Sequence, residues 1–303
     1  MLALQTNLDS KVDKVTADNM MEDIAEIQNT LYLPYKAIDL GLPSGILWAD
    51  RNIGATDIYD GGKLFQWGDP TPYDIPEHTN GTINEGQKMF SWSDYKWNPS
   101  GDSSTFTKYN STDGKLTLDP EDDAAHVNMG SDWRMPTQDD IKELFQNTTQ
   151  ELYAKLTDDS DPVKVANGVY NENDISVYWT YIDGHTSDKV NGKLTYMKLL
   201  SKSNGNFLVV PFSVSANNGY IGLENDGGNF WSSSLNSGGN NYAWYSFFTK
   251  YDYGVSLHYD RAIGIGIRGV TTSTKKVSIL DNKVDKIDLI PFLERIDKIE
   301  KPA

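Results

Sequence analysis

The stretch IDLGLPSGILWA, residues 38–49, opens the part of the chain whose character decides the fold. Its short apolar runs are interrupted by Gly41, Pro43 and Gly45, and this texture continues from residue 35 to about residue 271. Glycine, tryptophan, tyrosine, asparagine and serine are abundant there. Because closely spaced turn signals leave room only for short strands, the region 35–271 is expected to fold into short strands joined by long loops.

Two segments of this region carry helix signals instead. Asp119 is a natural N-cap, Pro120 suits the first helical position, and Gly130 is a stop signal. Thr137 is expected to cap a second helix. The apolar residues of that second helix recur at helical spacing and are Ile141, Leu144 and Phe145.

The two ends of the chain, residues 1–34 and 272–303, are polar, free of glycine and helix-favouring. Their apolar residues recur at steps of three and four, which predicts helical oligomerisation segments, and such short helices need a partner. Residues 8–15, LDSKVDKV, match residues 280–287, LDNKVDKI, at six of eight positions. This near-repeat is either a coincidence between two charged helical stretches or an oligomerising element used twice.

Composition excludes several functional classes. The chain has 303 residues, a formal net charge of -16 and no cysteine. The negative field repels phosphate backbones, so nucleic acid is not an expected partner. Without cysteine there is no disulfide, thiolate nucleophile or cysteine-based zinc site. No secretory signal and no run of about 18 apolar residues is found. We therefore expect the chain to be made in the cytoplasm and not to insert into a membrane.

A series of short motifs runs through the central region in a fixed order. In chain order they are IDLGLPSGILWA (38–49) with NIGA (52–55), FQWGD (65–69), LDPEDDAA (118–125), WRMPT (133–137), FWSSS (230–234), AW (243–244) and GIRGV (266–270). With these motifs the region resembles the Fibrobacter succinogenes major paralogous domain family. The resemblance implies an α+β, C-type-lectin-like domain with short strands, two helices and long loops. Residues 146–206 depart from the family pattern and are expected to be longer and locally reshaped.

The resemblance also implies a biological setting. The helical ends are similar to those of bacteriophage fibre proteins, including those of crAss-like phages, in which such helices trimerise. We therefore expect a homotrimer that contacts other virion proteins and reaches the outside in the virion, by lysis of the host. Some lectin-fold phage proteins are diversified by retroelements that mutate adenines and so vary Asn and Tyr codons near the C-terminus. Residues 236–260 have the place and composition of such a variable region, and the codons would decide.

The same 25 residues are the best candidate for a binding surface. Five are Tyr, three Ser, three Gly and three Asn, and this mixture is typical of binding loops because tyrosine gives large amphipathic contacts at low entropy cost. The alternative is that these aromatics are ordinary strand residues. Ala243, Phe248 and Val255 are expected to face inward. The candidate binding residues, expected to face outward or lie in loops, are Asn236, Ser237, Asn240, Tyr245, Phe247, Tyr251, Asp252, Tyr253, Ser256, His258, Tyr259 and Asp260.

An acidic cluster could bind calcium or serve hydrolysis. Asp119, Glu121, Asp122 and Asp123 lie within five residues, yet their spacing is not that of a calcium loop. Acids in the first turn of a helix also complement its dipole. We therefore favour a helix start and keep calcium as a minor hypothesis, with no other cofactor expected.

Enzymatic motifs are missing from the sequence. The four histidines, at positions 78, 126, 185 and 258, have no metal-ligand spacing, and neither a G-x-S-x-G elbow nor a phosphate loop occurs. GIGIRG, residues 264–269, precedes no helix signal and is expected to be a final core strand. Formylglycine-generating oxidases, a related lectin-fold group, depend on cysteines. The chain is therefore not expected to be an enzyme, and we predict no catalytic residue.

The tryptophans divide into two groups. Four lie inside the family motifs and are expected in the core: Trp48, Trp67, Trp133 and Trp231. Trp92 and Trp97, near Tyr95, are better candidates for exposed rings.

The sequence therefore leaves three hypotheses for function. The first is a phage fibre protein that binds a bacterial surface receptor, glycan or protein, through residues 236–260. The second is a structural decoration or joining protein whose lectin-like domain docks to other virion proteins, which the near-repeat at both ends favours. The third, a hydrolase that uses paired carboxylates, is the least favoured.

Overall fold

The computed structural model describes residues 35–272 except 188, 191, 223–226, 252 and 255, and except the side chains of residues 253 and 254. The predicted arm 1–34 and, apart from Thr272, the predicted tail 272–303 lie outside the described residues. Tyr35–Ser273 clusters as one compact unit. Its described part has mostly antiparallel sheets and few helices, so the α+β class is as predicted.

The first and last described strands meet in a small three-stranded sheet. Its central strand, β2 (Leu47–Ala49), pairs with β1 (Ala37–Ile38) on one side and with β16 (Val270–Thr271) on the other. Trp48 lies opposite one residue of each neighbour and is fully buried. The stretch 38–49 therefore joins the two ends of the unit.

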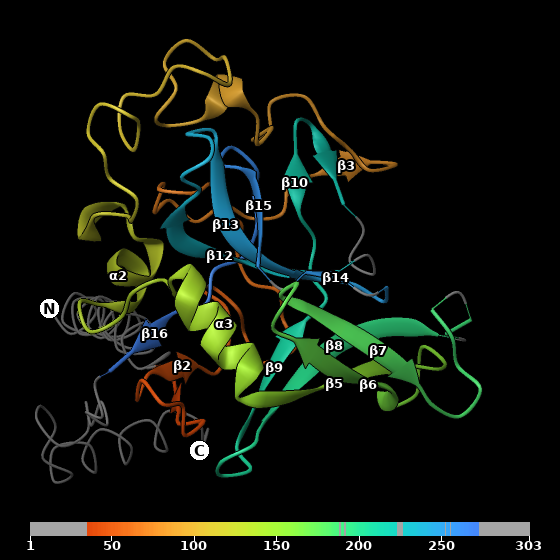
Figure 1. Cartoon of the computed structure of the whole chain (residues 1–303). Coiled ribbons are helices and arrows are strands. Elements are labelled where there is room, and N and C mark those ends of the chain that lie inside the picture. Colours follow the sequence, from red (N-terminus) through yellow and green to blue (C-terminus); the bar gives the residue numbers. More distant parts are fainter. Residues whose placement is uncertain are drawn as a thin grey trace, which may run out of the picture. The chain divides into compact units, whose positions relative to one another are not determined.

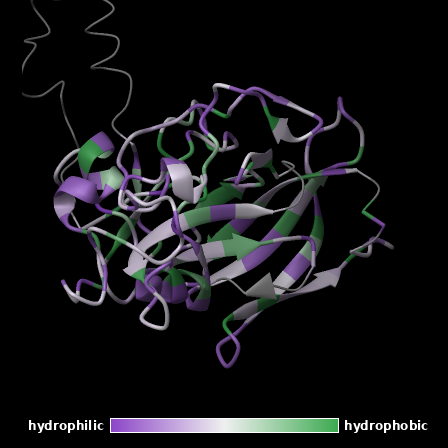
Figure 2. Ribbon diagram, turned by 90° about the horizontal axis from the view of Figure 1, so that it is seen from above, coloured by the Kyte–Doolittle hydropathy of each residue, from purple (hydrophilic) through white to green (hydrophobic). Residues whose placement is uncertain are grey.

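Residues 146–206 supply four strands of the largest sheet, whose strand order is β14-β7-β6-β5-β8-β9 (Figure 1). Burial alternates along β5, since Leu152 and Ala154 are fully buried while Glu151 and Tyr153 are only partly so. Hydrophobic and hydrophilic residues accordingly alternate along the strands in Figure 2. The bounds are β5 Thr148–Lys155, β6 Val163–Asn171, β7 Ser176–Tyr181, β8 Lys193–Ser201, β9 Phe207–Pro211 and β14 Tyr253–Gly254.

Two further antiparallel sheets complete the unit. A three-stranded sheet has the order β12-β13-β15, and a four-stranded sheet of very short strands has the order β10-β11-β4-β3. The bounds are β12 Gly228–Leu235, β13 Tyr242–Phe248, β15 Leu257–Asp260, β3 His78–Thr79, β4 Thr82–Ile83, β10 Ala216–Asn217 and β11 Tyr220–Ile221.

The second predicted helix is confirmed. α3 (Gln138–Gln146) begins at Thr137, whose hydroxyl accepts a hydrogen bond from the backbone N–H of Asp140, while the Asp140 carboxylate accepts one from the N–H of Thr137. This reciprocal pair is a capping box and satisfies two of the unpaired N–H groups of the first turn. Its three predicted apolar residues are all fully buried.

The first predicted helix is shorter than expected and starts later. Asp119 precedes only a 3-10 turn, η2 (Pro120–Asp122), and the α-helix proper, α2, covers Ala124–Met129. Asp123 caps α2 by accepting hydrogen bonds from the N–H groups of Ala125 and His126. The predicted stop at Gly130 is confirmed, with a φ of 103° that favours glycine. A further 3-10 turn, η1, covers Trp92–Asp94.

The core confirms the first group of tryptophans and corrects the second. Trp48, Trp67 and Trp231 are fully buried and Trp133 is 9% exposed. Trp92 and Trp97, expected to be exposed, are instead partly buried and packed against core residues. Indole N–H groups need an acceptor when they are buried, and that of Trp97 donates to the Gly68 carbonyl at 2.8 Å.

The predicted final strand 264–269 is buried but is not a regular strand. Isolated bridges join Ile265 to Phe65 and Gly264 to Ala216, so each short piece pairs with a different part of the chain. A continuous ladder needs one partner strand, and this segment has several partners.

Candidate binding site

The candidate residues are organised by the β13–β15 hairpin. β13 pairs with β15 so that Trp244 lies opposite His258 and Ala243 lies opposite Tyr259, while the other edge of β13 pairs with β12. Because successive side chains of a strand point to opposite faces, the hairpin presents two different aromatic faces. We call these rings the hairpin surface, which consists of Tyr242, Trp244, Tyr245, Phe247, His258 and Tyr259.

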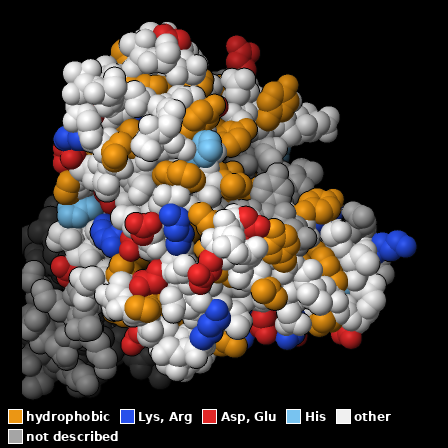
Figure 3. Space-filling view, in the orientation of Figure 1, with side chains coloured by type: hydrophobic (Ala, Val, Ile, Leu, Met, Phe, Trp, Pro, Cys, Tyr) orange, Lys and Arg blue, Asp and Glu red, His pale blue; other side chains and the backbone are white. Residues whose placement is uncertain are grey.

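The first face carries a row of three rings. The His258 imidazole lies 5.3 Å from the Tyr242 ring and 5.4 Å from the Trp244 ring, centroid to centroid, with edge-to-face angles of 65° and 79°. His258 is exposed and Tyr242 is 36% exposed. Figure 3 shows hydrophobic side chains gathered around a histidine over β13 and β15. Edge-to-face packing holds these rings in place while part of each stays in contact with solvent.

The second face lines a groove of about 390 Å³. Tyr245 and Phe247 stack with their centroids 5.8 Å apart, and Tyr259 meets Tyr245 edge-to-face at 6.2 Å. Tyr259 is 41% exposed, and its hydroxyl accepts a hydrogen bond from the Asn217 amide at 3.4 Å. Asn229 also lines the groove, and its buried Oδ1 has no hydrogen-bond partner among the described residues. An unsatisfied buried acceptor is uncommon and marks a place where a ligand donor could bind.

Three of the twelve candidate residues are buried, which corrects the expectation that they face outward. Tyr245 is 8% exposed because its ring packs against Trp231 at 5.8 Å. Asn236 is 8% exposed, since its side chain accepts a hydrogen bond from the Gly238 N–H and so shapes the turn before β13. Ser256 is 6% exposed.

The remaining candidates do not form one continuous surface. Ser237 is exposed and Asn240 is half-buried in the turn before β13. Tyr251, by contrast, is 47% exposed and lies beside the largest sheet. The loop just before Tyr251 is tied to that sheet, because the Trp179 indole donates to the Thr249 carbonyl at 2.9 Å. Phe247 and Asp260 are half-buried, and burial raises the pKa of the Asp260 carboxyl. Asp252 and the side chain of Tyr253 lie outside the described residues.

Sequence reasoning missed several residues that the fold adds to the site. Tyr242 and Trp244 lie inside the predicted stretch, and their alternation with buried Ala243 could have indicated that they face outward. Ser215, Asn217 and Asn229 line the groove from outside the stretch. No sequence signal links these three positions to the hairpin, because only the sheet arrangement brings them there. Of the inward predictions, Ala243 and Phe248 are confirmed, while Val255 lies outside the described residues.

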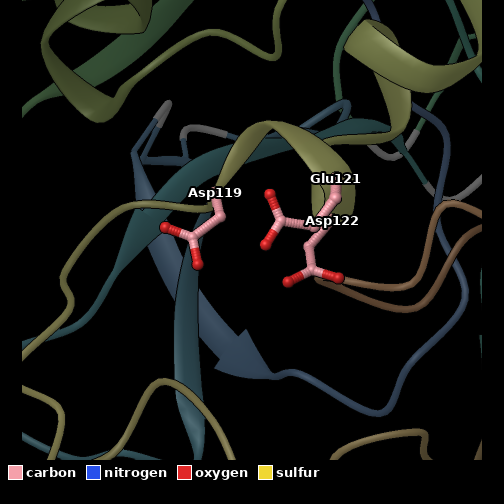
Figure 4. Close-up of side chains that lie close together, drawn as sticks. All are labelled: Asp119, Glu121 and Asp122. Carbon is pink, nitrogen blue, oxygen red and sulfur yellow. The ribbon is translucent and has the colours of Figure 1, made fainter.

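The acidic cluster gathers three of the four predicted carboxylates, Asp119, Glu121 and Asp122 (Figure 4). The Lys108 ammonium lies among them, at 2.7 Å, 3.2 Å and 2.5 Å respectively. Lys96 contacts Asp122 at 3.1 Å. The charge that a cation would neutralise is therefore already balanced by lysine side chains. Asp123 points elsewhere, because it caps α2 and accepts from the Met135 N–H.

Hydrogen bonding lowers the pKa values of two carboxyls in this cluster. Hydrogen bonds from Lys108 and Lys115 lower the pKa of Asp119. Burial alone would raise the pKa of Asp122, but hydrogen bonds from Lys108, the Tyr109 hydroxyl and Lys96 outweigh burial and lower it. In the described part of the chain, no other group of three His, Cys, Asp or Glu side chains comes close enough to share an ion. The lysine contacts thus leave little uncompensated charge for a calcium ion, while the helix-start interpretation holds for Asp123 alone, because the other three acids precede α2.

Comparison with known proteins adds no family assignment. No family model, no curated protein and no solved structure matches the chain. Within the described residues, none of the helices combines the length and the apolar character that crossing a bilayer requires.

Proposed function

We propose that this chain is a bacteriophage fibre protein that binds a bacterial surface receptor through the hairpin surface of a C-type-lectin-like domain. The observation that carries the proposal is that aromatic rings reach solvent on both faces of one hairpin, beside the unsatisfied Asn229 amide oxygen. Tyrosine and tryptophan residues contribute much of the binding free energy at protein interfaces, and adjacent polar groups add adaptable hydrogen bonds.

The lectin-like part of the proposal is supported by the motif order and by the architecture. The first and last described strands both pair with β2 in one sheet, and long, mostly irregular segments such as residues 84–119 connect the elements between them. Each of the seven family motifs contributes at least one fully buried residue. A scaffold of this kind can carry a variable surface, because loops and hairpin faces change without disturbing the core.

Binding would be reversible and would involve no chemical step. Individual contacts by partly exposed rings give modest affinity, so repeated copies in a homotrimeric fibre would raise the apparent affinity by avidity. The protein would act in the virion, and the helical ends would join it to other virion proteins. We propose no catalytic residue.

A second candidate function is a structural role, in which the domain docks to other proteins of the particle. The near-repeat of residues 8–15 at residues 280–287 favours it, because two similar ends suit a protein anchored on both sides.

The test is the binding of labelled full-length protein to cells of candidate bacterial hosts. We would compare the wild type with a Tyr242→Ala, Tyr259→Ala double variant. The control is Tyr178→Ala, because Tyr178 is 42% exposed and lies on β7 of the largest sheet, outside the hairpin surface. Saturable binding that the double variant loses and the control keeps is the expected result. If neither wild type nor control binds any susceptible host, the receptor-binding proposal is rejected in favour of the structural role.

A further inference from the structure

A second groove lies away from the hairpin surface, between the largest sheet and the loop of residues 58–64. Its volume is about 550 Å³, larger than that of the groove beside β13 and in the usual range of small-molecule sites. It shares none of the residues that line the hairpin groove. The residues used below are Tyr59, Lys155, Asp161, Lys193, Tyr196 and Ser213.

Three tyrosines pack together at this groove, and two of them, Tyr59 and Tyr196, line it. Tyr153 and Tyr196 are directly opposite on β5 and β8, and their rings stack with centroids 4.7 Å apart and planes 17° apart. Tyr59, from the loop, meets Tyr196 at 5.1 Å. Tyr59 is 55% exposed and Tyr196 is 8% exposed, so the loop tyrosine is the ring that a ligand can reach most fully.

The loop holds Tyr59 in a fixed position. The Asp57 carboxylate accepts hydrogen bonds from the N–H groups of Tyr59 at 2.7 Å and Asp60 at 3.1 Å. Asp60 in turn accepts from the N–H groups of Thr56 and Gly62. Gly62 has a φ of 74°, and a Cβ there would lie 2.4 Å from the Ile53 carbonyl, so only glycine permits this turn. A ring that is ordered before binding costs little entropy when a ligand arrives.

Two hydroxyl groups of the groove are available for hydrogen bonding. Ser213 is only 7% exposed, and its buried hydroxyl has no hydrogen-bond partner among the described residues. No described residue hydrogen-bonds the Tyr196 hydroxyl either, and burial raises its pKa to about 12, so it keeps its proton as a donor. Unsatisfied polar groups beside an aromatic ring are the pattern of a site that fixes a ligand's orientation.

The charges at the groove are balanced despite the strongly acidic chain. Lys155 and Lys193 contribute two positive charges, and Asp60 and Asp161 contribute two negative ones. A strongly charged ligand would gain little from this arrangement. Strand addition by a peptide is also disfavoured, because β5 and β8 are paired on both edges within the sheet.

We propose that this groove binds a neutral saccharide, with a sugar ring against the exposed part of the Tyr59 ring and its hydroxyl groups bonded to Ser213 and Tyr196. Sugar rings present C–H groups on their faces and hydroxyls at their edges, which matches an exposed tyrosine ring beside hydroxyl groups. The site is independent of the proposed receptor-binding role, so that either can fail without the other.

The experiment is calorimetric titration of the full-length protein with maltotriose, cellotriose and mannotriose, with trigalacturonate as a charged comparison. At least one neutral trisaccharide is expected to bind, and trigalacturonate more weakly. Tyr59→Ala should weaken that binding about tenfold or more, since an aromatic contact with its buried area contributes that much. Tyr59→Phe, which keeps the ring, should retain most of it.

Two controls make the result decisive. Because Tyr59 is largely exposed, Tyr59→Ala should leave the far-UV circular dichroism unchanged and lower the Tm only slightly. Tyr259→Ala, at the hairpin surface, should bind the trisaccharide as the wild type does. The proposal is overturned if none of the three neutral trisaccharides binds the wild type. It is also overturned if Tyr59→Ala binds undiminished, or if Tyr259→Ala is the variant that loses binding.

Discussion

The acidic cluster and the hairpin surface are the two densest local signals in this sequence, and the fold treats them in opposite ways. The carboxylates at positions 119, 121 and 122 each contact the Lys108 ammonium, and Asp122 also accepts from the Tyr109 hydroxyl at 2.7 Å. The hairpin leaves rings partly exposed and leaves the Asn229 amide oxygen without a partner among the described residues. A cluster whose groups satisfy one another stabilises the fold, whereas one that leaves groups unsatisfied has capacity to bind. Density of a residue type therefore indicates a site less well than unsatisfied contacts do.

The largest effect is expected for Asp122→Ala, which tests whether the acidic cluster stabilises the fold. The Asp122 side chain is 3% exposed and contacts Lys96, Lys108 and Tyr109. Its removal takes the acceptor from Lys96 and from the Tyr109 hydroxyl and leaves Lys108 with two of its three carboxylates. We expect the free energy of unfolding to fall by about 3 kcal/mol, measured by urea denaturation. Asp139→Ala is the matched control, because Asp139 is 90% exposed and its single ion-pair partner within the described residues is Lys142. It should change stability by no more than about 0.5 kcal/mol. Equal effects of the two substitutions would contradict a structural role for the acidic cluster.

The opposite expectation applies to Tyr259→Ala. Its ring is 41% exposed and loses one edge-to-face contact and one long hydrogen bond, so the free energy of unfolding should fall by about 1 kcal/mol, while receptor binding should weaken about tenfold. Thermal denaturation and cell binding of the same preparation measure both quantities. A large loss of stability with unchanged binding would mean that Tyr259 is an ordinary strand residue.

Acid titration sharpens the comparison further. The pKa values of Asp119 and Asp122 are lowered in the folded state, so their stabilising effect is fully present above the ordinary aspartate pKa of about 3.9. It is lost as the pH falls through the lowered folded-state values. We expect the unfolding free energy to decline below about pH 4, and to decline less steeply in Asp122→Asn, where that carboxylate is absent. Parallel curves for wild type and Asp122→Asn would show that Asp122 does not contribute to acid sensitivity.

The smallest expected effect is that of calcium. Because Lys108 lies among the carboxylates, calcium chloride should leave the Tm of the wild type unchanged. Lys108→Ala removes the ammonium, and calcium should then restore part of the stability that this substitution costs. A clear rise of the wild-type Tm with calcium would revive the metal hypothesis for the acidic cluster.

The local features of the fold could be predicted from the sequence because they depend on neighbouring residues. The cap at Thr137, the stop at Gly130 and the buried motif tryptophans follow from capping chemistry, glycine's conformational range and apolar surface. The start of α2 is later than predicted, because four acidic residues within five positions offer several starts, and Asp123 is selected by its bonds to Met135 across the fold.

The sequence by itself determined the α+β class, the second helix with its buried face, the four motif tryptophans of the core and the stretch that holds the hairpin surface. Tertiary structure alone decided which of those twelve candidate residues are exposed, because Tyr245 is covered by Trp231 from another strand. It also decided that Asn217 and Asn229 join them, and that Tyr59 meets Tyr196 across 137 positions of sequence. Local patterns report on bonds between neighbours, whereas a binding site is made by side chains that only the packing of distant segments brings together.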